Sequence, residues 1–375
     1  MTMHVITNFA ASGGAETMLA RLLSVAEGPQ TVVSLIESSD RNTGLAANPR
    51  ARFVDLGARH AAQMPGAALR LARLIREDGA DTIMCWMYHG QIIGTLAARL
   101  SRRPVRVIWN VRQALDDPAA LSRSTRLAVR LARLLSPQAA CIVYNSDRAR
   151  IQHRAAGFAA GRDMVIPNGV VVPPPRQEPP RPARRFGIAA RFHPQKDFDT
   201  FFAAAAQAAQ RRPDLHFVAA GHGLDPSNPA IAEMMRRHAL PADRIELRGE
   251  QRDMDGFYAG IDALVLSSRT EGFPNVVAEA MAWGRPVVAT AVGDTAAIIG
   301  DSGVVVPPRR PDLLAGGICD LAARPAAEIA QLGRTARARI EADFSLGMIA
   351  ERYDRLLRQG GPAPLTGAAM CGDGG

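Results

Sequence analysis

Residues 263–290 read ALVLSSRTEGFPNVVAEAMAWGRPVVAT. The apolar run at 263–268 predicts a buried strand, and the small and polar residues after it predict a loop. A helical pattern then continues to Trp283, with Gly284 as its stop, and a second apolar run begins near residue 286. Because a strand, a helix and a second strand follow one another, this stretch predicts a parallel βαβ unit.

The same alternation extends over almost the whole chain of 375 residues. It predicts strands near residues 4–9, 31–36, 52–56, 81–86, 105–110, 141–145 and 164–167, and then near 186–191, 216–221, 245–249, 263–268, 286–290 and 303–306. Between the two series, residues 167–182 contain seven prolines in sixteen positions, a density that excludes a helix or a central strand. We therefore expect two Rossmann-like α/β domains, joined by a semi-rigid linker, whose parallel sheets face a central cleft.

Length and composition exclude several classes of protein. Hydrophobic residues make up 47% of the chain and charged residues 22%, which excludes disorder throughout. The first residues lack the pattern of a signal peptide, and no uncharged apolar run reaches the roughly 18 residues of a membrane span. Cys85, Cys141, Cys319 and Cys371 are scattered, without the spacing of a metal site. We expect a cytoplasmic protein with reduced thiols and no metal.

The charge is distributed unevenly. Residues 1–180 contain 22 arginines and 13 acidic residues, whereas the charges of residues 181–375 balance. This asymmetry indicates either an anionic partner (a membrane surface, a phosphorylated substrate or a nucleic acid) or an ordinary solvated surface. Because an aromatic content of 5% offers few platforms for base stacking, we expect no nucleic-acid partner.

Two stretches of the first half carry candidate residues directly after predicted strands. Gly13 and Gly14 lie between a strand and a helix, where glycine lets an anion approach the helix N-terminus, although a tight turn alone would also require glycine. His89 lies where the helix after strand 81–86 begins. It either takes part in chemistry at the sheet edge or only forms a hydrogen bond at the start of the helix.

In the second half, Arg191 and Lys196 follow a predicted strand and precede a helix. Lys196 is the only lysine of the chain. Two cations beside a helix N-terminus suit a diphosphate, although two solvated cations would give the same pattern.

Glu271 directly precedes the loop GFPN, and Glu279 lies on the predicted helix after this loop. Glu271 could accept hydrogen bonds from sugar hydroxyls, and Glu279, on the helix, could bind a ribose. Both could instead only complement the helix dipole, but the surrounding strand, GFPN loop and helix favour a ligand site more strongly than the spacing alone. The amides of Phe273, Asn275, Val276 and Val277 are expected to contact phosphate or sugar oxygens, and Gly272 is a further candidate for donor binding.

Basic and apolar stripes occur on two predicted helices. The arginines are Arg70, Arg73 and Arg76 on one helix and Arg123, Arg126, Arg130 and Arg133 on the other, where Leu127, Leu131, Leu134 and Leu135 form a second stripe. Such a helix either lies on an anionic membrane surface or directs its leucines into its own core.

Six motifs in this order, GGAE, WMYHGQIIG, VIPNG, RFHPQKD, EGFPNVVAEAMAWGRPVVAT and VVVPP, resemble glycosyltransferase family 4, whose members are retaining enzymes of the GT-B fold. The resemblance covers nearly the whole chain. It implies transfer of a hexose-type sugar from a nucleotide-diphospho-sugar, with a UDP-sugar favoured over a GDP-sugar. WMYH followed by WNVR further resembles enzymes of bacterial surface-polysaccharide biosynthesis, which implies a lipid-linked or glycan acceptor.

The resemblance also implies roles for individual residues of the second half. Glu271 matches the glutamate that contacts the transferred sugar, and Glu279 the one that holds the nucleotide ribose. Arg191 and Lys196 match the basic pair that neutralises the donor diphosphate. The sequence departs from the family at Asp197, where many members have glycine, and at His222, where an acidic residue is common.

In the first half, His89 matches the active-site histidine close to the donor sugar and the attacking acceptor, and Gly14 the glycine loop that approaches the phosphates. Arg112, in the loop 110–118, is the candidate for acceptor binding. We expect an acceptor domain at 1–170, a linker at 171–182, a donor domain at 183–345, a helix at 346–359 that packs back on the first domain, and a disordered tail at 360–375.

The absence of an aspartate-rich metal motif, together with the fixed positive potential of Arg191, Lys196 and two helix N-termini, predicts metal-independent transfer. Retention at the anomeric carbon is what the resemblance implies. The alternatives are a nucleotide-sugar epimerase on the same fold and a non-catalytic scaffold or nucleotide-sugar-binding protein. The basic stripes extend the expected location from the cytoplasm to peripheral attachment on the inner face of the cytoplasmic membrane.

Overall fold

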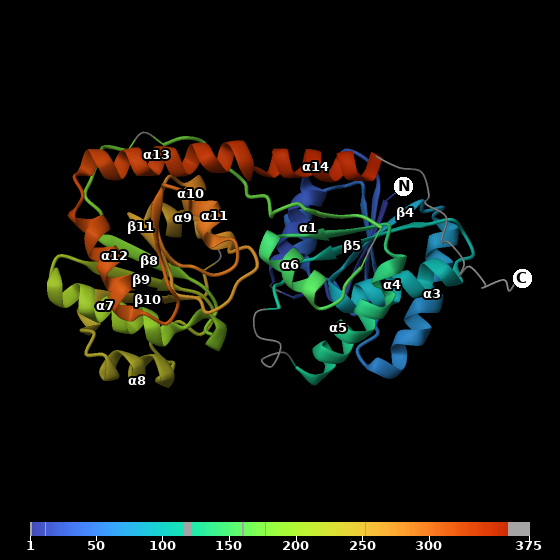
Figure 1. Ribbon diagram of the computed structural model, residues 1–375, viewed down its shortest axis with the longest axis horizontal. Coiled ribbons are helices and arrows are strands. Elements are labelled where there is room, and N and C mark those ends of the chain that lie inside the picture. Colours follow the sequence, from blue (N-terminus) through green and yellow to red (C-terminus); the bar gives the residue numbers. More distant parts are fainter. Residues whose placement is uncertain are drawn as a thin grey trace, which may run out of the picture. The chain divides into compact units, whose positions relative to one another are not determined.

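The computed structural model describes residues 2–11, 13–115, 122–159, 161–176, 178–251 and 253–358. The chain divides into two compact units (Figure 1): unit 1 comprises Met1–Pro167 and Ile349–Gly375, and unit 2 comprises Asn168–Met348. The predicted tail at 360–375 and residues 116–118 of the predicted loop lie outside the described residues.

Unit 1 is built on a parallel sheet of seven strands in the order β3-β2-β1-β4-β5-β6-β7. The strands are β1 (Thr2–Ile6), β2 (Gln30–Ser34), β3 (Ala51–Asp55), β4 (Thr82–Trp86), β5 (Arg106–Val111), β6 (Cys141–Tyr144) and β7 (Asp163–Val165). The central strands are buried on both faces, as expected when helices cover both sides of a parallel sheet. The order reverses between β1 and β4, so the loops that follow these two strands lie side by side.

The helices of unit 1 are α1 (Gly14–Ser24), α2 (Asp40–Ala46), α3 (Met64–Glu77), α4 (Met87–Leu100), α5 (Arg123–Leu135) and α6 (Asp147–Ala155), with 3-10 turns at Ala61–Gln63 and Ser136–Gln138. Helix α4 packs between α3 and α5, and all three contribute side chains to one apolar cluster.

Unit 2 contains a parallel sheet of six strands in the order β10-β9-β8-β11-β12-β13. The strands are β8 (Arg185–Ala189), β9 (His216–Ala220), β10 (Ile245–Gly249), β11 (Ala263–Leu266), β12 (Val287–Thr290) and β13 (Gly303–Val306). Alternate residues of these strands enter two separate cores, one on each face. The predicted fold of two parallel α/β sheets is therefore confirmed. In unit 2 the strand order reverses between β8 and β11.

The helices of unit 2 are α7 (Phe198–Arg211), α8 (Pro229–Arg237), α9 (Met254–Ala259), α10 (Asn275–Ala282), α11 (Thr295–Ile299), α12 (Pro311–Ala323) and α13 (Ala326–Asp343), with 3-10 turns at Pro194–Lys196 and Ala242–Arg244. Helices α7 and α12 pack together over one core, and α9, α10 and α11 line the other.

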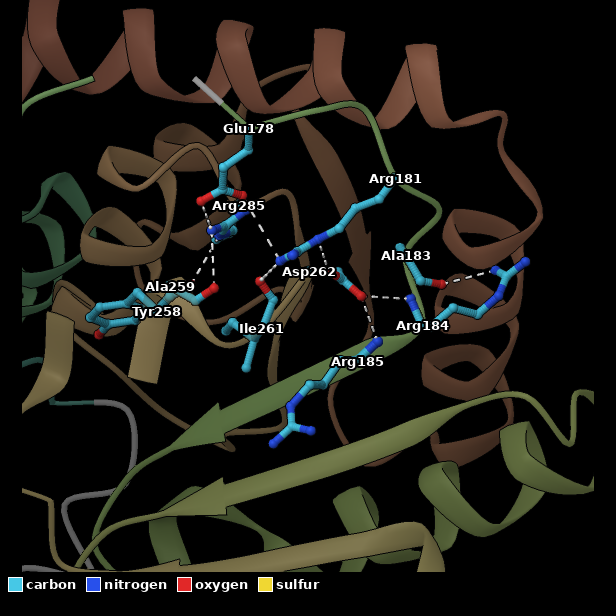
Figure 2. A network of polar contacts seen from close by, with 10 residues as sticks. All are labelled: Glu178, Arg181, Ala183, Arg184, Arg185, Tyr258, Ala259, Ile261, Asp262 and Arg285. Atoms are coloured by element: carbon cyan, nitrogen blue, oxygen red, sulfur yellow. Dashed lines mark hydrogen bonds and ion pairs between the residues drawn. The ribbon is translucent and has the colours of Figure 1, made fainter. Parts of the chain in front are cut away.

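The proline-rich segment is held on unit 2 (Figure 2). The Glu178 carboxylate accepts two hydrogen bonds of 2.9 Å from Arg285, whose guanidinium also donates to the Tyr258 carbonyl. Arg181 forms an ion pair of 2.6 Å with Asp262. These contacts explain why residues 168–182 group with unit 2 instead of forming a separate connection.

The last helix, α14 (Leu346–Arg358), returns the chain to unit 1. Its buried residues Ile349, Tyr353 and Leu356 lie on one face, at helical spacing. Asn110 donates to the Tyr353 hydroxyl at 3.0 Å, and Arg106 donates to the Leu356 carbonyl at 2.9 Å. Residues 349–358 are thus an integral layer of unit 1.

Candidate functional site

Lys196 and Glu271 meet where the strand order of unit 2 reverses. Lys196 follows β8 and Glu271 follows β11, and these strands are paired neighbours. Lys196 Nζ lies 2.6 Å from Glu271 Oε1, which also accepts a 2.7 Å hydrogen bond from the Ser268 hydroxyl. The two side chains are 20% and 10% exposed, so the ion pair is largely withdrawn from water. Crevices at such reversals are the usual ligand sites of open α/β sheets.

Asp197 shapes the loop that carries Lys196. Its φ of 49° is left-handed, a conformation that suits glycine and that aspartate tolerates. The buried Asp197 carboxylate forms an ion pair of 2.7 Å with Arg269 and accepts a 2.9 Å hydrogen bond from Thr200. Ser267 donates to the Lys196 carbonyl at 2.8 Å. Asp197, where many members of the family have glycine, thus has a backbone conformation that suits glycine and contacts the loop after β11.

The backbone of Glu271 is fixed by a distant glycine. Gly293 has a φ of 54°, and a Cβ at this position would lie 2.3 Å from the Gly272 carbonyl oxygen and 2.5 Å from that of Glu271. The next amide, of Asp294, donates to the Gly272 carbonyl at 3.1 Å. The loop after β12 therefore supports the loop after β11 at a distance that only glycine allows.

The predicted helix after the GFPN loop (residues 272–275) is α10, but it begins at Asn275 with Pro274 as its N-cap. The Val277 amide donates to the Pro274 carbonyl at 3.0 Å, so our expectation that this amide is available to a ligand is wrong. Contacts of Gly272, Phe273, Asn275 and Val276 with a donor stay predictions.

Glu279 lies on α10, one turn after the helix start. The buried Tyr258, on α9, donates from its hydroxyl to Glu279 Oε2 at 2.7 Å. This hydrogen bond orients the carboxylate, which is only partly buried. Its predicted contact with a ribose is untested.

The charges of Arg191 and Lys196 both act on the same side chain, that of His193. The pKa of His193, between them in sequence, is lowered first by burial and then by the charges of these two cations. Arg191 itself is exposed.

The adjacent loop after β9 closely approaches the segment that follows β8. A Cβ at Gly221, which has a φ of 143°, would lie 1.9 Å from the Ala190 carbonyl oxygen, and the Phe192 amide donates to the His222 carbonyl at 2.8 Å. The side chain of His222 is 81% exposed and lies 3.6 Å from the Glu250 carboxylate. Its departure from the family therefore concerns a side chain that faces solvent.

In unit 1, His89 lies in the first turn of α4, directly after β4. Helix α4 approaches β1 so closely that a Cβ at Gly90 would lie 2.9 Å from the Val5 carbonyl oxygen. Met87, at the start of the helix, has a left-handed φ of 61°. Burial lowers the pKa of His89, which favours the neutral imidazole at pH 7.

The two predicted glycines lie after β1, the neighbour of β4. Gly13 is the N-cap of α1 and Gly14 its first residue. A Cβ at Gly13 would lie 2.4 Å from the flexible Glu16 carboxylate. Because β1 and β4 are paired, the structure places these glycines and His89 at the same edge of the sheet.

Arg112 is packed inside unit 1. It is 8% exposed, lies 5.3 Å from the ring of Trp86 and 5.6 Å from that of Tyr353, and donates to the Ile166 carbonyl at 3.2 Å. Burial lowers the pKa of its guanidinium to about 9. Arg112 thus links β4 to α14, and its predicted contact with an acceptor is untested.

Three residues that support the site were not predicted from the sequence. Ser268, three residues before Glu271 and at the end of a buried strand, could have been found from its position. Tyr258 and Gly293 could not, because they reach the site from other parts of the chain. Among the described residues, no group of three or more His, Cys, Asp or Glu side chains is arranged to hold a metal ion. Within the same residues, no helix is long and apolar enough to cross a membrane.

Comparison with known proteins identifies both halves of the chain. Residues 12–172 match the family described as Glycosyltransferase Family 4, and residues 183–324 match the one described as Glycosyl transferases group 1. The chain is 28% identical over 269 residues to the lipopolysaccharide core biosynthesis mannosyltransferase LpcC of Rhizobium leguminosarum. This alignment covers 68% of the chain and 71% of LpcC.

A second relative is the lipopolysaccharide core biosynthesis mannosyltransferase LpsB of Rhizobium meliloti, 37% identical over 115 residues. That alignment covers 30% of this chain and spans only a third (33%) of LpsB. The crystal structure of Anabaena HepE in complex with UDP matches with a TM-score of 0.80 at 19% identity, over 95% of this chain and 99% of HepE. This last likeness shows the fold.

Proposed function

The chain belongs to the family 4 glycosyltransferases of the GT-B fold, and we propose that it transfers a hexose-type sugar, with retention, from a nucleotide-diphospho-sugar to a glycan or lipid-linked acceptor. The observation that carries this proposal is the Lys196–Glu271 pair at the strand reversal of unit 2. It places a cation suited to phosphate against a carboxylate suited to sugar hydroxyls, within a hydrogen bond of each other.

In this mechanism, Lys196 and Arg191 stabilise the charge that develops on the leaving diphosphate, and Glu271 holds the hydroxyls of the sugar. The bond from the anomeric carbon to the diphosphate oxygen breaks, while the acceptor oxygen bonds to the same face of that carbon. The acceptor proton passes to the leaving phosphate oxygen, so no separate base is needed. His89, neutral because burial lowers its pKa, contacts the sugar and the acceptor by hydrogen bonds.

The fixed charges of Arg191 and Lys196 support transfer without a divalent metal, since the cation that a diphosphate requires is already part of the chain. Loss of activity in EDTA, restored by Mg²⁺ or Mn²⁺, would refute this part of the proposal.

The names of LpcC and LpsB support a hexose, namely a mannosyl unit, and an acceptor in a lipopolysaccharide core. The UDP in the HepE structure supports a uridine donor. Calorimetric titration with UDP, GDP and CDP tests which nucleotide the sugar donor carries, and we expect UDP to bind most tightly. Binding of GDP alone would exclude a UDP-sugar donor, and binding of none would refute the proposed function.

We also propose that α5 attaches the enzyme to an anionic membrane surface. Leu127, Leu131 and Leu134 are 57%, 43% and 66% exposed, so they do not face the core of their own unit. The buried residues of the helix are instead Ala128 and Ala132. Its four arginines are exposed as well, and the helix contains no acidic residue.

An exposed stripe of leucines beside arginines is the composition of helices that lie in a membrane interface. Each basic residue near an anionic surface contributes about 1 kcal/mol to binding. This attachment would bring the enzyme to a lipid-linked acceptor at the inner face of the cytoplasmic membrane.

A further inference from the structure

The chain passes between the two units twice, after Pro167 and after Met348. Around these points, the crossing segments (residues 168–172 and 344–348) pair with each other. The Val170 amide donates to the Phe344 carbonyl at 3.0 Å, and the Leu346 amide donates to the Val170 carbonyl at 2.8 Å. The two crossings thus form one short parallel junction, and its bridge at Val170 and Ser345 belongs to unit 2.

Both crossing segments contact the GFPN loop. From the first, Asn168 Nδ2 donates to Asn275 Oδ1 at 2.6 Å, and Asn168 is only 2% exposed. From the second, the ring of Phe344 packs at 5.7 Å from the ring of Phe273. Asn275 and Phe273 are two of the residues proposed to contact the donor.

These contacts matter because a loop can present its amides to a ligand only if its own conformation is held. Gly293 holds the start of this loop from the sheet side, through the carbonyls of Glu271 and Gly272. Asn168 and Phe344 hold the rest of the loop, through a part-buried hydrogen bond to Asn275 and an aromatic contact with Phe273. Removing either should therefore loosen the loop without touching the Lys196–Glu271 pair.

We propose that Asn168 and Phe344 are positioning residues of the donor site, and that they couple occupancy of the GFPN loop to the order of the crossing segments. The motif VIPNG, which contains Asn168, thereby gains a role that its sequence does not reveal. The inference rests on the proposed function, because it requires that this loop binds the donor. By linkage, a ligand that orders the loop also stabilises the segments packed on it.

The test uses Asn168→Ala and Phe344→Leu, with Val171→Ala as control, because Val171 lies in the same crossing but is 60% exposed. Loss of a neutral hydrogen bond contributes about 0.5–1.5 kcal/mol, so we expect the Kd for UDP to rise about 2- to 12-fold in Asn168→Ala. Phe344→Leu should weaken binding similarly, Val171→Ala should bind like wild type, and the donor KM should change more than kcat.

Amide hydrogen exchange distinguishes a positioning role of these residues from a purely structural one. In wild type, UDP should protect residues 168–172 and 344–348 together with the GFPN loop, and Asn168→Ala should lose the protection of the first crossing. Wild-type affinity in both Asn168→Ala and Phe344→Leu would overturn the inference, as would protection of the loop without the crossings. Those outcomes leave the proposed function intact, whereas failure of wild type to bind UDP, GDP and CDP would remove both.

Discussion

Lys196 Nζ and Glu271 Oε1, from residues 75 positions apart in sequence, lie 2.6 Å from each other in unit 2. Under the proposed function, a donor diphosphate would compete with Glu271 for Lys196. If the ammonium turned to the phosphates, the Glu271 carboxylate would keep its hydrogen bond from Ser268 and become available to the sugar. We propose that the pair in this way connects recognition of the diphosphate with recognition of the sugar.

Glu271→Gln should separate these two functions. Without the carboxylate charge, Lys196 is no longer neutralised, so UDP should bind at least as tightly as to wild type. Sugar contacts are weakened at the same time, and kcat for slow hydrolysis of the donor should fall by about 10- to 150-fold, because a charged hydrogen bond is worth about 1.5–3 kcal/mol. Weaker binding of UDP to Glu271→Gln would contradict the competition between carboxylate and phosphate.

Gly293→Ala should damage the site through the backbone of Glu271. Its Cβ would lie 2.3–2.5 Å from two carbonyl oxygens, so the loop after β11 must move. Gly284→Ala is the matched control: its φ of 67° is also left-handed, but its Cβ would lie 3.5 Å from the nearest carbonyl oxygen.

Both variants should lose about 1–2 kcal/mol of stability from the left-handed backbone, and only Gly293→Ala should also lose affinity for the nucleotide. Calorimetry and thermal unfolding measure the two effects separately. Equal nucleotide affinities in the two variants would show that Gly293 does not support the site.

Replacing Leu127, Leu131 and Leu134 together by serine should abolish sedimentation with vesicles of phosphatidylglycerol and phosphatidylcholine at low salt. Wild type should bind these vesicles, release them as salt increases, and ignore vesicles of phosphatidylcholine alone. Ile151→Ser is the control, because Ile151 is a 63% exposed apolar residue on another helix, α6. If wild type fails to bind anionic vesicles at low salt, membrane attachment through α5 is wrong.

Stability should fall on acidification, because two histidines of unit 1 are buried in neutral form. Burial lowers the pKa of His4 and of His153 to about 4, whereas both titrate near 6.5 in the unfolded chain. Between these values the unfolded state binds protons that the native state does not. The contribution of these two histidines to the free energy of unfolding should therefore be fully present above pH 6.5. It should decrease by about 3 kcal/mol per histidine as the pH falls to 4.

His153→Gln tests this origin of the pH dependence, because glutamine does not titrate but retains polar groups for Tyr88 and for the Ala149 carbonyl. Denaturant unfolding at pH 7, 5.5 and 4.5 should show a smaller pH dependence than in wild type. An unaltered slope in His153→Gln would contradict the assignment.

The sheets were predictable because strands buried on both faces produce continuous apolar runs between helical patterns. The first strand shows the limit of this signal. The apolar pattern extends to Phe9, but β1 ends at Ile6. Phe9 is buried beyond the strand, where it forms only an isolated bridge with Ser38 and its amide donates to Ser34 Oγ. Burial alone therefore does not define the end of a strand.

The candidate site was predictable where its residues follow strands in sequence, as Lys196 and Glu271 do. Its supports, Gly293, Tyr258 and Asn168, were not, because each contact joins segments distant in the chain. Nor does the pattern of α5 reveal which face is buried, since leucines and alanines recur with the same helical period. The structure decides that the alanines pack inward.

The central claim, that Lys196 meets the donor diphosphate, is tested by comparing UDP with UMP in wild type and in Lys196→Ala. Wild type should prefer the diphosphate by about 10- to 100-fold, the equivalent of one charged hydrogen bond, and Lys196→Ala should lose most of this preference while binding UMP as wild type does. An undiminished preference for UDP in Lys196→Ala would contradict the account.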